Sequence, residues 1–333
     1  MRKLSAAFSL LLLLPAHSLL SQAPCDTALI RAALVQSNQL LDGGQLQPAV
    51  DACVLALSSL AACTDADAVF REAIIGQAAD CYHRAADEFV YRGMLNRGID
   101  MGERSIALYR QLPENGDLLA TAYLELAQTY AQNDNRKIAL EQAINGLKTR
   151  QAANPLSSKI ASHYDQIVGI YLGMDDLEGA LAYLGDWETL RRRLGSKASL
   201  QMRVNLANNW ALYYYAKNNI PQAIRILEDT LALYGEPLRA KGGIVGIAEF
   251  GLCEYYTVLG NYEKSLFYAE KNVALFELRL RQQRGQLFGR SHYAWCLAQS
   301  ARAAWGLYRQ TRDTAWYNLA ERRSQQTEQM IFA

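Results

Sequence analysis

The sequence predicts an all-α solenoid built from antiparallel helix pairs. A motif of an aromatic residue, an apolar residue, a small residue and a second aromatic residue returns along the chain, and a further small residue follows nine positions later. One copy consists of Tyr123, Leu126, Ala127, Tyr130 and Ala139. The next consists of Tyr164, Ile167, Val168, Tyr171 and Ala180. A third copy uses Trp210, Ala211, Tyr214 and Ala223, with Ala207 in place of the first aromatic residue.

The second small residue of each copy serves as a marker of the repeat. The markers are Ala49, Gly98, Ala139, Ala180, Ala223 and Ser265. From Gly98 onward they are separated by 41, 41, 43 and 42 residues. A fixed period of this size is typical of stacked repeats, in which each unit buries its apolar face only against its neighbours.

Each period contains two helices. Apolar residues spaced by three or four positions place one buried stripe on the first helix. The turn that follows is rich in Asn, Asp and Gly, and Pro48 and Pro221 then fall in the first turn of the second helix, where a missing N–H is tolerated. The small marker residues let the two helices approach closely. We expect six pairs, and a seventh between Ser291 and Gln329.

These residues resemble the tetratricopeptide repeat family over about Thr27 to Thr327. The period is longer than the common form of roughly 34 residues. The resemblance implies a right-handed superhelix whose first helices line a concave groove. It also implies that this groove binds a protein or peptide ligand.

The amino terminus predicts export. Arg2 and Lys3 precede an apolar run from Leu4 to Leu14, which is shorter than the roughly 20 residues of a membrane span. We interpret residues 1–21 as a secretory signal peptide, although cleavage after Ser18 or Ala23 fits the pattern equally. Residues 25–333 then form the helical repeat domain, with a periplasmic or extracellular location.

Export would place the six cysteines where disulfides persist. If Thr27 to Leu41 and Gln47 to Leu60 form an antiparallel hairpin, Cys25 and Cys63 become neighbours. We therefore predict a disulfide between these two. The alternative is that all the cysteines are small buried thiols, an interpretation that suits Cys53 and Cys253 in particular.

Composition argues against several classes of function. Lys and Arg total 34 against 33 acidic residues, so no strong field favours nucleic acid. His292 and Cys296 are four positions apart on an expected helix, but two ligands do not make a zinc site. No nucleophile, base and acid set is visible. We therefore predict a non-enzymatic chain with no catalytic residues, no metal and no cofactor.

The resemblance points to specific residues of the groove, at outward positions of the first helices. They are Asp87, Gln128, Asp165, Asn205, Asn208, Tyr215, Phe250 and Glu254. Amide and phenol groups such as those of Asn205, Asn208 and Tyr215 can hydrogen-bond an extended peptide backbone without requiring charge. The alternative is a solvated inner face. The Lys and Arg clamp with which some family members hold carboxyl-terminal peptides is missing.

The segment from Ala303 to Gln329 resembles the one that joins tetratricopeptide arrays to the caspase-like peptidase domain called CHAT. Arg312 stands where that segment usually has Gly. The leading expectation is thus the amino-terminal recognition half of a CHAT-type protein. The extracytoplasmic sensor region of a signalling kinase and a free-standing envelope scaffold are the alternatives.

Overall fold

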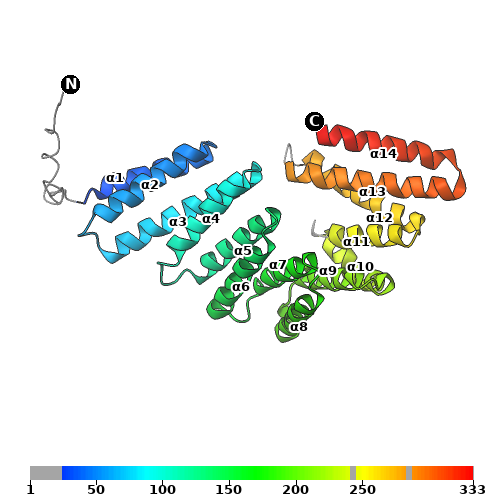
Figure 1. The fold of residues 1–333 in the computed structure, drawn as a ribbon, viewed down its shortest axis with the longest axis horizontal. Coiled ribbons are helices and arrows are strands. Elements are labelled where there is room, and N and C mark those ends of the chain that lie inside the picture. The colour runs from blue at the N-terminus through cyan, green and yellow to red at the C-terminus, as the bar shows by residue number, and fades with distance from the viewer. Residues whose placement is uncertain (1–24, 241–244, 283–286, 333) are drawn as a thin grey trace, which may run out of the picture. The chain divides into compact units, whose positions relative to one another are not determined.

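A computed structural model describes residues 25–240, 245–282 and 287–332 (Figure 1). The predicted signal peptide, residues 1–21, lies outside these ranges. The described residues form helices α1 to α14, one short 3₁₀ turn, and no strand. They divide into two compact units, Met1–Ala122 and Tyr123–Ala333.

The first unit contains two complete helix pairs and the start of α5. Its helices are α1 (Thr27–Asp42), α2 (Leu46–Ala62), α3 (Ala68–Tyr91) and α4 (Leu95–Tyr109). Each helix packs against the next, and α1 also contacts α3. The core is a continuous cluster that includes Ile30, Leu34, Ile74 and Phe89. Asp67 caps α3 by accepting a hydrogen bond of 2.7 Å from the N–H of Phe70.

The second unit continues the same alternation. Its helices are α5 (Gly116–Gln132), α6 (Arg136–Ala153), α7 (Ile160–Gly173), α8 (Leu177–Leu194), α9 (Leu200–Ala216), α10 (Ile220–Ala240), α11 (Val245–Val258), α12 (Tyr262–Gln282), α13 (Leu287–Thr311) and α14 (Thr314–Phe332). The first helices α7, α9, α11 and α13 contact one another in sequence, and each also packs on the second helix of the preceding pair. None of the described helices combines the length and apolar character needed to cross a bilayer.

One backbone feature marks every pair. The turn between its two helices contains a single residue with positive φ: Gly44, Gly93, Asp134, Asp175, Asn218, Gly260 and Arg312. In the first six pairs the following residue donates its N–H to the carbonyl five positions earlier, as Asn135 does to Tyr130 at 2.9 Å. This hydrogen bond closes the end of the first helix. The positive-φ residue in each of the seven turns confirms the repeat prediction and extends its register to the last described pair.

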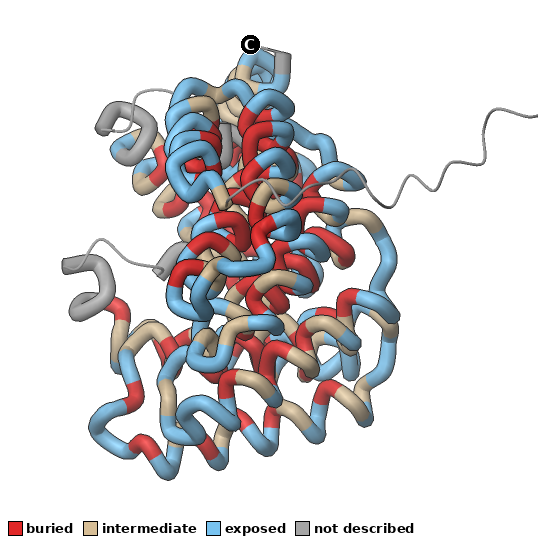
Figure 2. The backbone as a smooth tube through the Cα atoms, turned by 90° about the vertical axis from the view of Figure 1, so that its left-hand side faces the viewer, coloured by how far each residue is buried: buried red, intermediate tan, exposed pale blue. Residues whose placement is uncertain are grey.

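The same register explains the small residues. The position seven before each positive-φ residue and the position five after it are buried in the first six pairs (Figure 2). The former are Ser37, Ala86, Ala127, Val168, Ala211 and Cys253, and the latter are the six markers. At Gly98 an added Cβ would lie 2.5 Å from Val90 Cγ2. Glycine is therefore required where α3 and α4 cross.

The seventh pair breaks this rule. The equivalent positions hold Trp305 and Tyr317, whose side chains are 45% and 41% exposed. Its turn also differs, because the N–H of Asp313 donates to Thr311 Oγ1 rather than to the carbonyl of Tyr308. The last pair thus keeps the backbone register and replaces two small buried residues with two large exposed ones.

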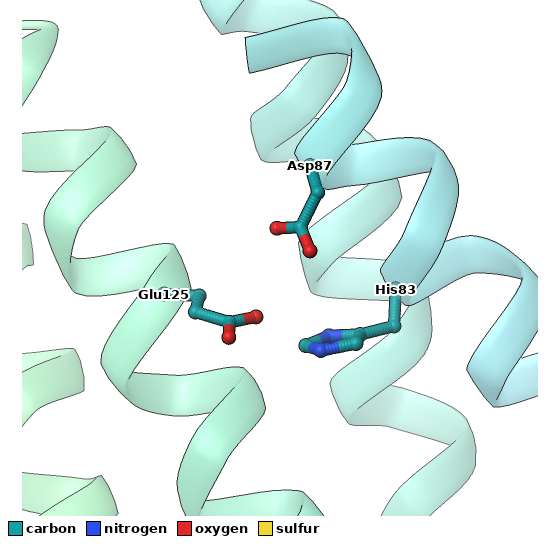
Figure 3. A group of neighbouring side chains, drawn as sticks. All are labelled: His83, Asp87 and Glu125. Carbon is teal, nitrogen blue, oxygen red and sulfur yellow. The ribbon is translucent and has the colours of Figure 1, made fainter. Parts of the chain in front are cut away.

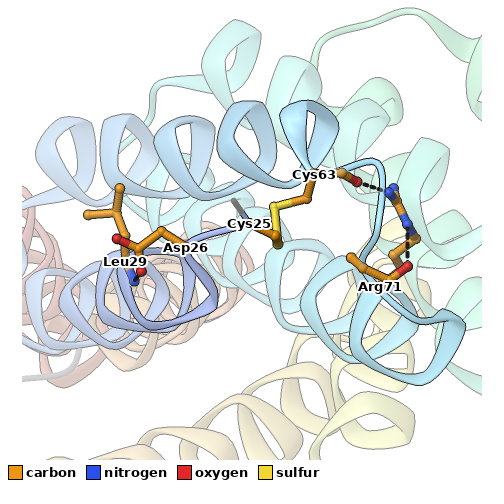
Figure 4. Close-up of a disulfide and its surroundings, with 6 residues drawn as sticks. Cys25, Asp26, Leu29, Cys63 and Arg71 are labelled. Carbon is orange, nitrogen blue, oxygen red and sulfur yellow. Dashed lines mark hydrogen bonds between the residues drawn. A yellow bond between two sulfur atoms is a disulfide. The ribbon is translucent and has the colours of Figure 1, made fainter. Parts of the chain in front are cut away.

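A disulfide joins the two ends of the first pair (Figure 4). Cys25 precedes α1 and Cys63 follows α2, with their Cα atoms 4.8 Å apart. The guanidinium of Arg71 donates to the carbonyl oxygens of both Cys63 and Ala66, which fixes the segment that leads into α3. Asp26 accepts from the N–H of Leu29 at 2.9 Å and caps α1. The cross-link therefore lies between two anchored helix ends.

Candidate functional site

The first helices of the last three pairs surround a cavity of about 480 Å³. Residues of α9, α11 and α13 line it: Asn208, Leu212, Ile247, Phe250, Gly251, Glu254, Tyr255, His292 and Trp295. Ser199 caps the start of α9, because its hydroxyl accepts a hydrogen bond of 3.1 Å from the N–H of Met202. Three of the residues that the sequence places in a groove, Asn208, Phe250 and Glu254, meet here.

Aromatic rings form one side of the cavity. The ring centroid of Phe250 lies 4.5 Å from that of Trp295 and 6.5 Å from that of His292. His292 also stacks on Phe276 of α12, with ring centroids 5.9 Å apart. Leu212 and Ile247 add exposed aliphatic surface, at 38% and 40%. This side can accept an apolar side chain.

Polar groups gather on the other side. The predicted groove residue Tyr215 lies outside the lining but stacks on the lining residue Tyr255, with ring centroids 4.7 Å apart. Burial, and then the negative charge of Glu254, raises the pKa of Tyr215, so its hydroxyl stays protonated and able to donate. Tyr255 is 1% exposed, and its hydroxyl has no hydrogen-bond partner among the described residues. A buried hydroxyl without a partner costs free energy in the folded state.

Asp165 on α7 differs from the expectation of an open groove position. Its carboxylate accepts a hydrogen bond of 2.5 Å from the side-chain amide of Asn209 on α9. Burial raises the pKa of Asp165, and the bond from Asn209 opposes that change. Asn209, at 2% exposure, is the buried neighbour of Asn208. Asp165 therefore joins two successive first helices.

Comparison with solved structures gives the same architecture. Aspartyl phosphate phosphatase F of Bacillus subtilis matches with a TM-score of 0.54 and 13% identity, over 92% of this chain and 70% of that one. A tetratricopeptide repeat protein of Parabacteroides merdae matches with a TM-score of 0.50 and 14% identity, over 89% and 99%. The chain has a tetratricopeptide repeat fold.

A third solved structure is similar to this tetratricopeptide repeat chain. It is a Rap protein complexed with competence and sporulation factor, with a TM-score of 0.50 and 11% identity, over 91% of this chain and 99% of that one. At these identities the likeness concerns the fold alone. No protein-family model and no curated protein matches the sequence.

The remaining predicted groove residues lie outside the cavity lining. Asn205 is half-buried, and its side-chain oxygen accepts from Gln201 on the same helix. Gln128 is exposed on α5. Asp87 is exposed on α3, in the first unit, one turn after His83 (Figure 3). Glu125, the third side chain drawn there, belongs to α5 of the second unit.

Sequence reasoning missed the residues contributed by the start of α13. Trp295 and His292 precede the repeat motif of the last pair, because α13 is 25 residues long and begins well before that motif. Repeat markers give no signal there. The seventh pair was expected to begin at Ser291, but only the helical periodicity before Ala301 would have placed Trp295 on its inner face. Leu212 and Ile247 were missed because they are aliphatic residues with no distinctive motif.

Three of the four free cysteines carry thiols unsuited to chemistry, whereas the hydrogen bond with Cys53 lowers the pKa of the buried Cys81 thiol. Cys53, Cys253 and Cys296 are each 0% exposed. Burial raises the pKa of Cys253 to about 11 and that of Cys296 to about 12, so neither forms a thiolate near neutral pH. His292 is exposed whereas Cys296, one turn later, is buried. These two side chains therefore face different surroundings, as expected for an incidental pair.

Proposed function

We propose that this protein is an exported, non-enzymatic scaffold that binds a protein or peptide segment in the cavity between α9, α11 and α13. The observation that carries the proposal is the meeting of Asn208, Phe250 and Glu254 in one cavity. They come from two successive first helices at positions selected by repeat register alone. A surface of unrelated polar residues would not be expected to converge in this way.

The chemistry of the cavity suits a short peptide segment. A volume of about 480 Å³ falls within the range of ligand pockets. The ring of Phe250 against that of Trp295 offers an apolar anchor site, and aromatic residues dominate such sites in recognition. The amide of Asn208 and the carboxylate of Glu254 can pair with backbone groups on either side of the anchored side chain.

One similar fold supports binding by the array as a whole. The Rap protein of that comparison is complexed with competence and sporulation factor. At 11% and 13% identity, the Rap protein and the phosphatase are both similar in architecture, and of these two the Rap structure holds a bound factor. The burial of the four free cysteines favours a binding role over catalysis.

For the cellular context we propose export to the periplasm or the extracellular space, supported by the charged and apolar pattern of residues 1–21 and by the Cys25–Cys63 disulfide. The likeness of Ala303 to Gln329 to a CHAT junction supports a regulatory role beside a peptidase domain. Gene sequence beyond Ala333 tests this context. A caspase-like domain would support it, whereas an apolar span or a stop codon would favour a kinase sensor or a free-standing scaffold.

The binding proposal is tested by selecting ligands from a displayed dodecapeptide library on the wild-type protein. Selected peptides are then measured by fluorescence anisotropy against a double variant, Asn208→Ala with Glu254→Ala. We expect that this variant weakens binding about tenfold or more, because interface groups at the centre of a site carry most of the affinity. Its helical content and melting temperature should match those of the wild type.

Gln128→Ala is the matched control. It removes an exposed amide from another first helix of the second unit, outside the cavity. This variant should bind the selected peptides as tightly as the wild type does. The groove assignment would be wrong if no peptide is enriched, or if enriched peptides bind the double variant as well as they bind the wild type.

A further inference from the structure

In the pairs α7–α8, α9–α10 and α11–α12, the first helix of the next pair packs on one face of the pair. In the last described pair, α13–α14, the equivalent face is exposed. Gly260 and Arg312 occupy the same turn position in α11–α12 and α13–α14, 52 residues apart. Residues 52 positions apart in these two pairs are therefore equivalent. In the α11–α12 pair the face is covered by α13, because Phe250 packs on Trp295 and Phe276 stacks on His292.

The equivalent residues of the last pair line an open groove. A hollow of about 630 Å³ lies between α13 and α14. Its lining includes Arg302, Trp305, Tyr317 and Glu328, the equivalents of Phe250, Cys253, Ser265 and Phe276. Cys253 and Ser265 are fully buried, whereas Trp305 and Tyr317 are 45% and 41% exposed. The groove continues the interface through which each pair receives the next first helix.

The chemistry of this face differs from that of an interior interface. Its centre holds a cluster of three rings, with Trp305 5.4 Å from Tyr308 and 6.1 Å from Tyr317. Small residues, Ala298, Ala301 and Ala320, form the floor between them. Exposed charged side chains replace the apolar residues at the edge. An aromatic centre with a polar edge is typical of surfaces that bind a partner reversibly.

The groove is held rigidly from behind. Glu270 of α12 accepts hydrogen bonds from Ser300 of α13 at 2.5 Å and from Arg323 of α14 at 2.5 and 3.0 Å. The Arg323 side chain is 12% exposed. Because both helices are tied to the same carboxylate, the groove walls need no ordering when a ligand binds, which lowers the entropic cost of association.

Charge indicates the nature of the occupant. Glu321 and Glu328 lie seven residues apart on α14, so both point along one wall of the groove, and Arg302 lies on the opposite wall. A bound helix would meet two carboxylates at the spacing of two helical turns. We propose that this face docks an amphipathic helix of a partner protein, one whose apolar stripe is bordered by basic residues along the edge that faces α14.

The test uses defined probes and not an unknown ligand. A labelled octadecapeptide carries Leu and Ala on one helical face and Lys along the edge of that face. A second peptide has Glu in place of each Lys, and a third has a central Pro that prevents a helix. Fluorescence anisotropy against the full chain should show binding of the Lys peptide, and binding about tenfold or more weaker for the other two.

Variants locate the binding. Trp305→Ser should weaken binding of the Lys peptide about tenfold, because it removes the central aromatic anchor. The double variant Glu321→Lys with Glu328→Lys should reverse the preference between the Lys and Glu peptides, so that the Glu peptide binds more tightly. Leu233→Ser and Glu141→Lys are the controls: each changes an exposed residue away from this face, Leu233 being 68% exposed. Both should bind the Lys peptide as the wild type does.

Three results would overturn the proposal. One is equal binding of all three peptides. Another is unchanged binding of the Lys peptide by the Trp305→Ser variant and by the charge-reversal variant, when both melt like the wild type in circular dichroism. The third is a concentration-dependent dimer in sedimentation that Trp305→Ser abolishes, because a second copy would then cover the face. These measurements use defined peptides and do not depend on whether any peptide binds the α9–α11–α13 cavity. Either proposal can therefore fail without the other.

Discussion

The first and the last helix pairs of the described chain each have a neighbour on one side only, and they meet that condition in different ways. The α1–α2 pair is closed by the Cys25–Cys63 disulfide and exposes scattered aliphatic side chains, such as Val35 and Val54. The α13–α14 pair has no cross-link. It is tied to α12 through Glu270 and carries a partly exposed aromatic cluster around Trp305.

The difference shows how an end pair of a solenoid can be stable without a covering neighbour. At the first pair, a covalent bond restricts the unfolded chain and needs no further packing area. At the last described pair, hydrogen bonds to Glu270 of the preceding pair contribute to stability, and Trp305 and Tyr317 are partly exposed. Scattered aliphatic residues are ordinary for a surface, whereas clustered aromatics with charged neighbours mark an interaction site.

The largest expected effect tests the first end. Replacing both cysteines, Cys25→Ser with Cys63→Ser, removes a cross-link that spans 38 residues. The chain-entropy relation predicts a loss of about 4 kcal/mol in the stability of this end. Hydrogen exchange of the α1 and α2 amides should therefore accelerate strongly, and exchange in α13 and α14 should not change.

Reductant gives the matched control for this prediction. Wild-type protein under reducing conditions should show the same acceleration as the double variant, and the variant itself should not respond to reductant. If alkylation without reductant labels Cys25 and Cys63 in the wild type, the cross-link is absent and the contrast between the two ends disappears.

The next effect compares an interior marker with its counterpart at the last pair. Ala139 is fully buried, so Ala139→Leu should overpack the contact between two helices and destabilise the second unit by about 1 to 3 kcal/mol. Trp305→Ala removes a half-exposed ring and should change stability by only about 0.5 kcal/mol. Urea unfolding measured by circular dichroism distinguishes the two. A large loss for Trp305→Ala would mean that this ring is a structural part of the pair.

The smallest effect concerns the turns. Arg312 has a φ of 59° and Gly260 a φ of 72° at equivalent positions. A left-handed conformation costs a non-glycine residue about 1 kcal/mol. Arg312→Gly should thus raise the melting temperature slightly, and Gly260→Ala should lower it by a similar amount. Thermal unfolding of the two variants checks this, and a lower melting temperature for Arg312→Gly would show that the Arg312 side chain stabilises the turn.

Periodicity was sufficient to predict most of the fold. Turn residues and small markers placed the helix pairs, because a buried contact between two helices admits only a small side chain at the crossing point. The last pair could not be aligned from the sequence. Its equivalent positions hold Trp305 and Tyr317, which do not match the pattern, and only the positive φ of Arg312 reveals the register.

The candidate site was predictable in part. Repeat register selected Asn208, Phe250 and Glu254, which line the cavity. It also selected Asp165, whose carboxylate instead pairs with Asn209, because register gives the direction of a side chain and not the partner that it finds. Trp295 belongs to an extension of α13 beyond the repeat, where register gives no information.

The sequence by itself determined the helices, their pairing and the positions that face inward, since these follow from local periodicity and from the size of residues at crossing points. The tertiary structure alone decided which inward positions meet in a cavity and which face of the last pair stays uncovered. Those features depend on how successive pairs stack. Asn208 and Phe250 hold equivalent positions of successive repeats, but the repeat period does not say which equivalent positions line a common cavity.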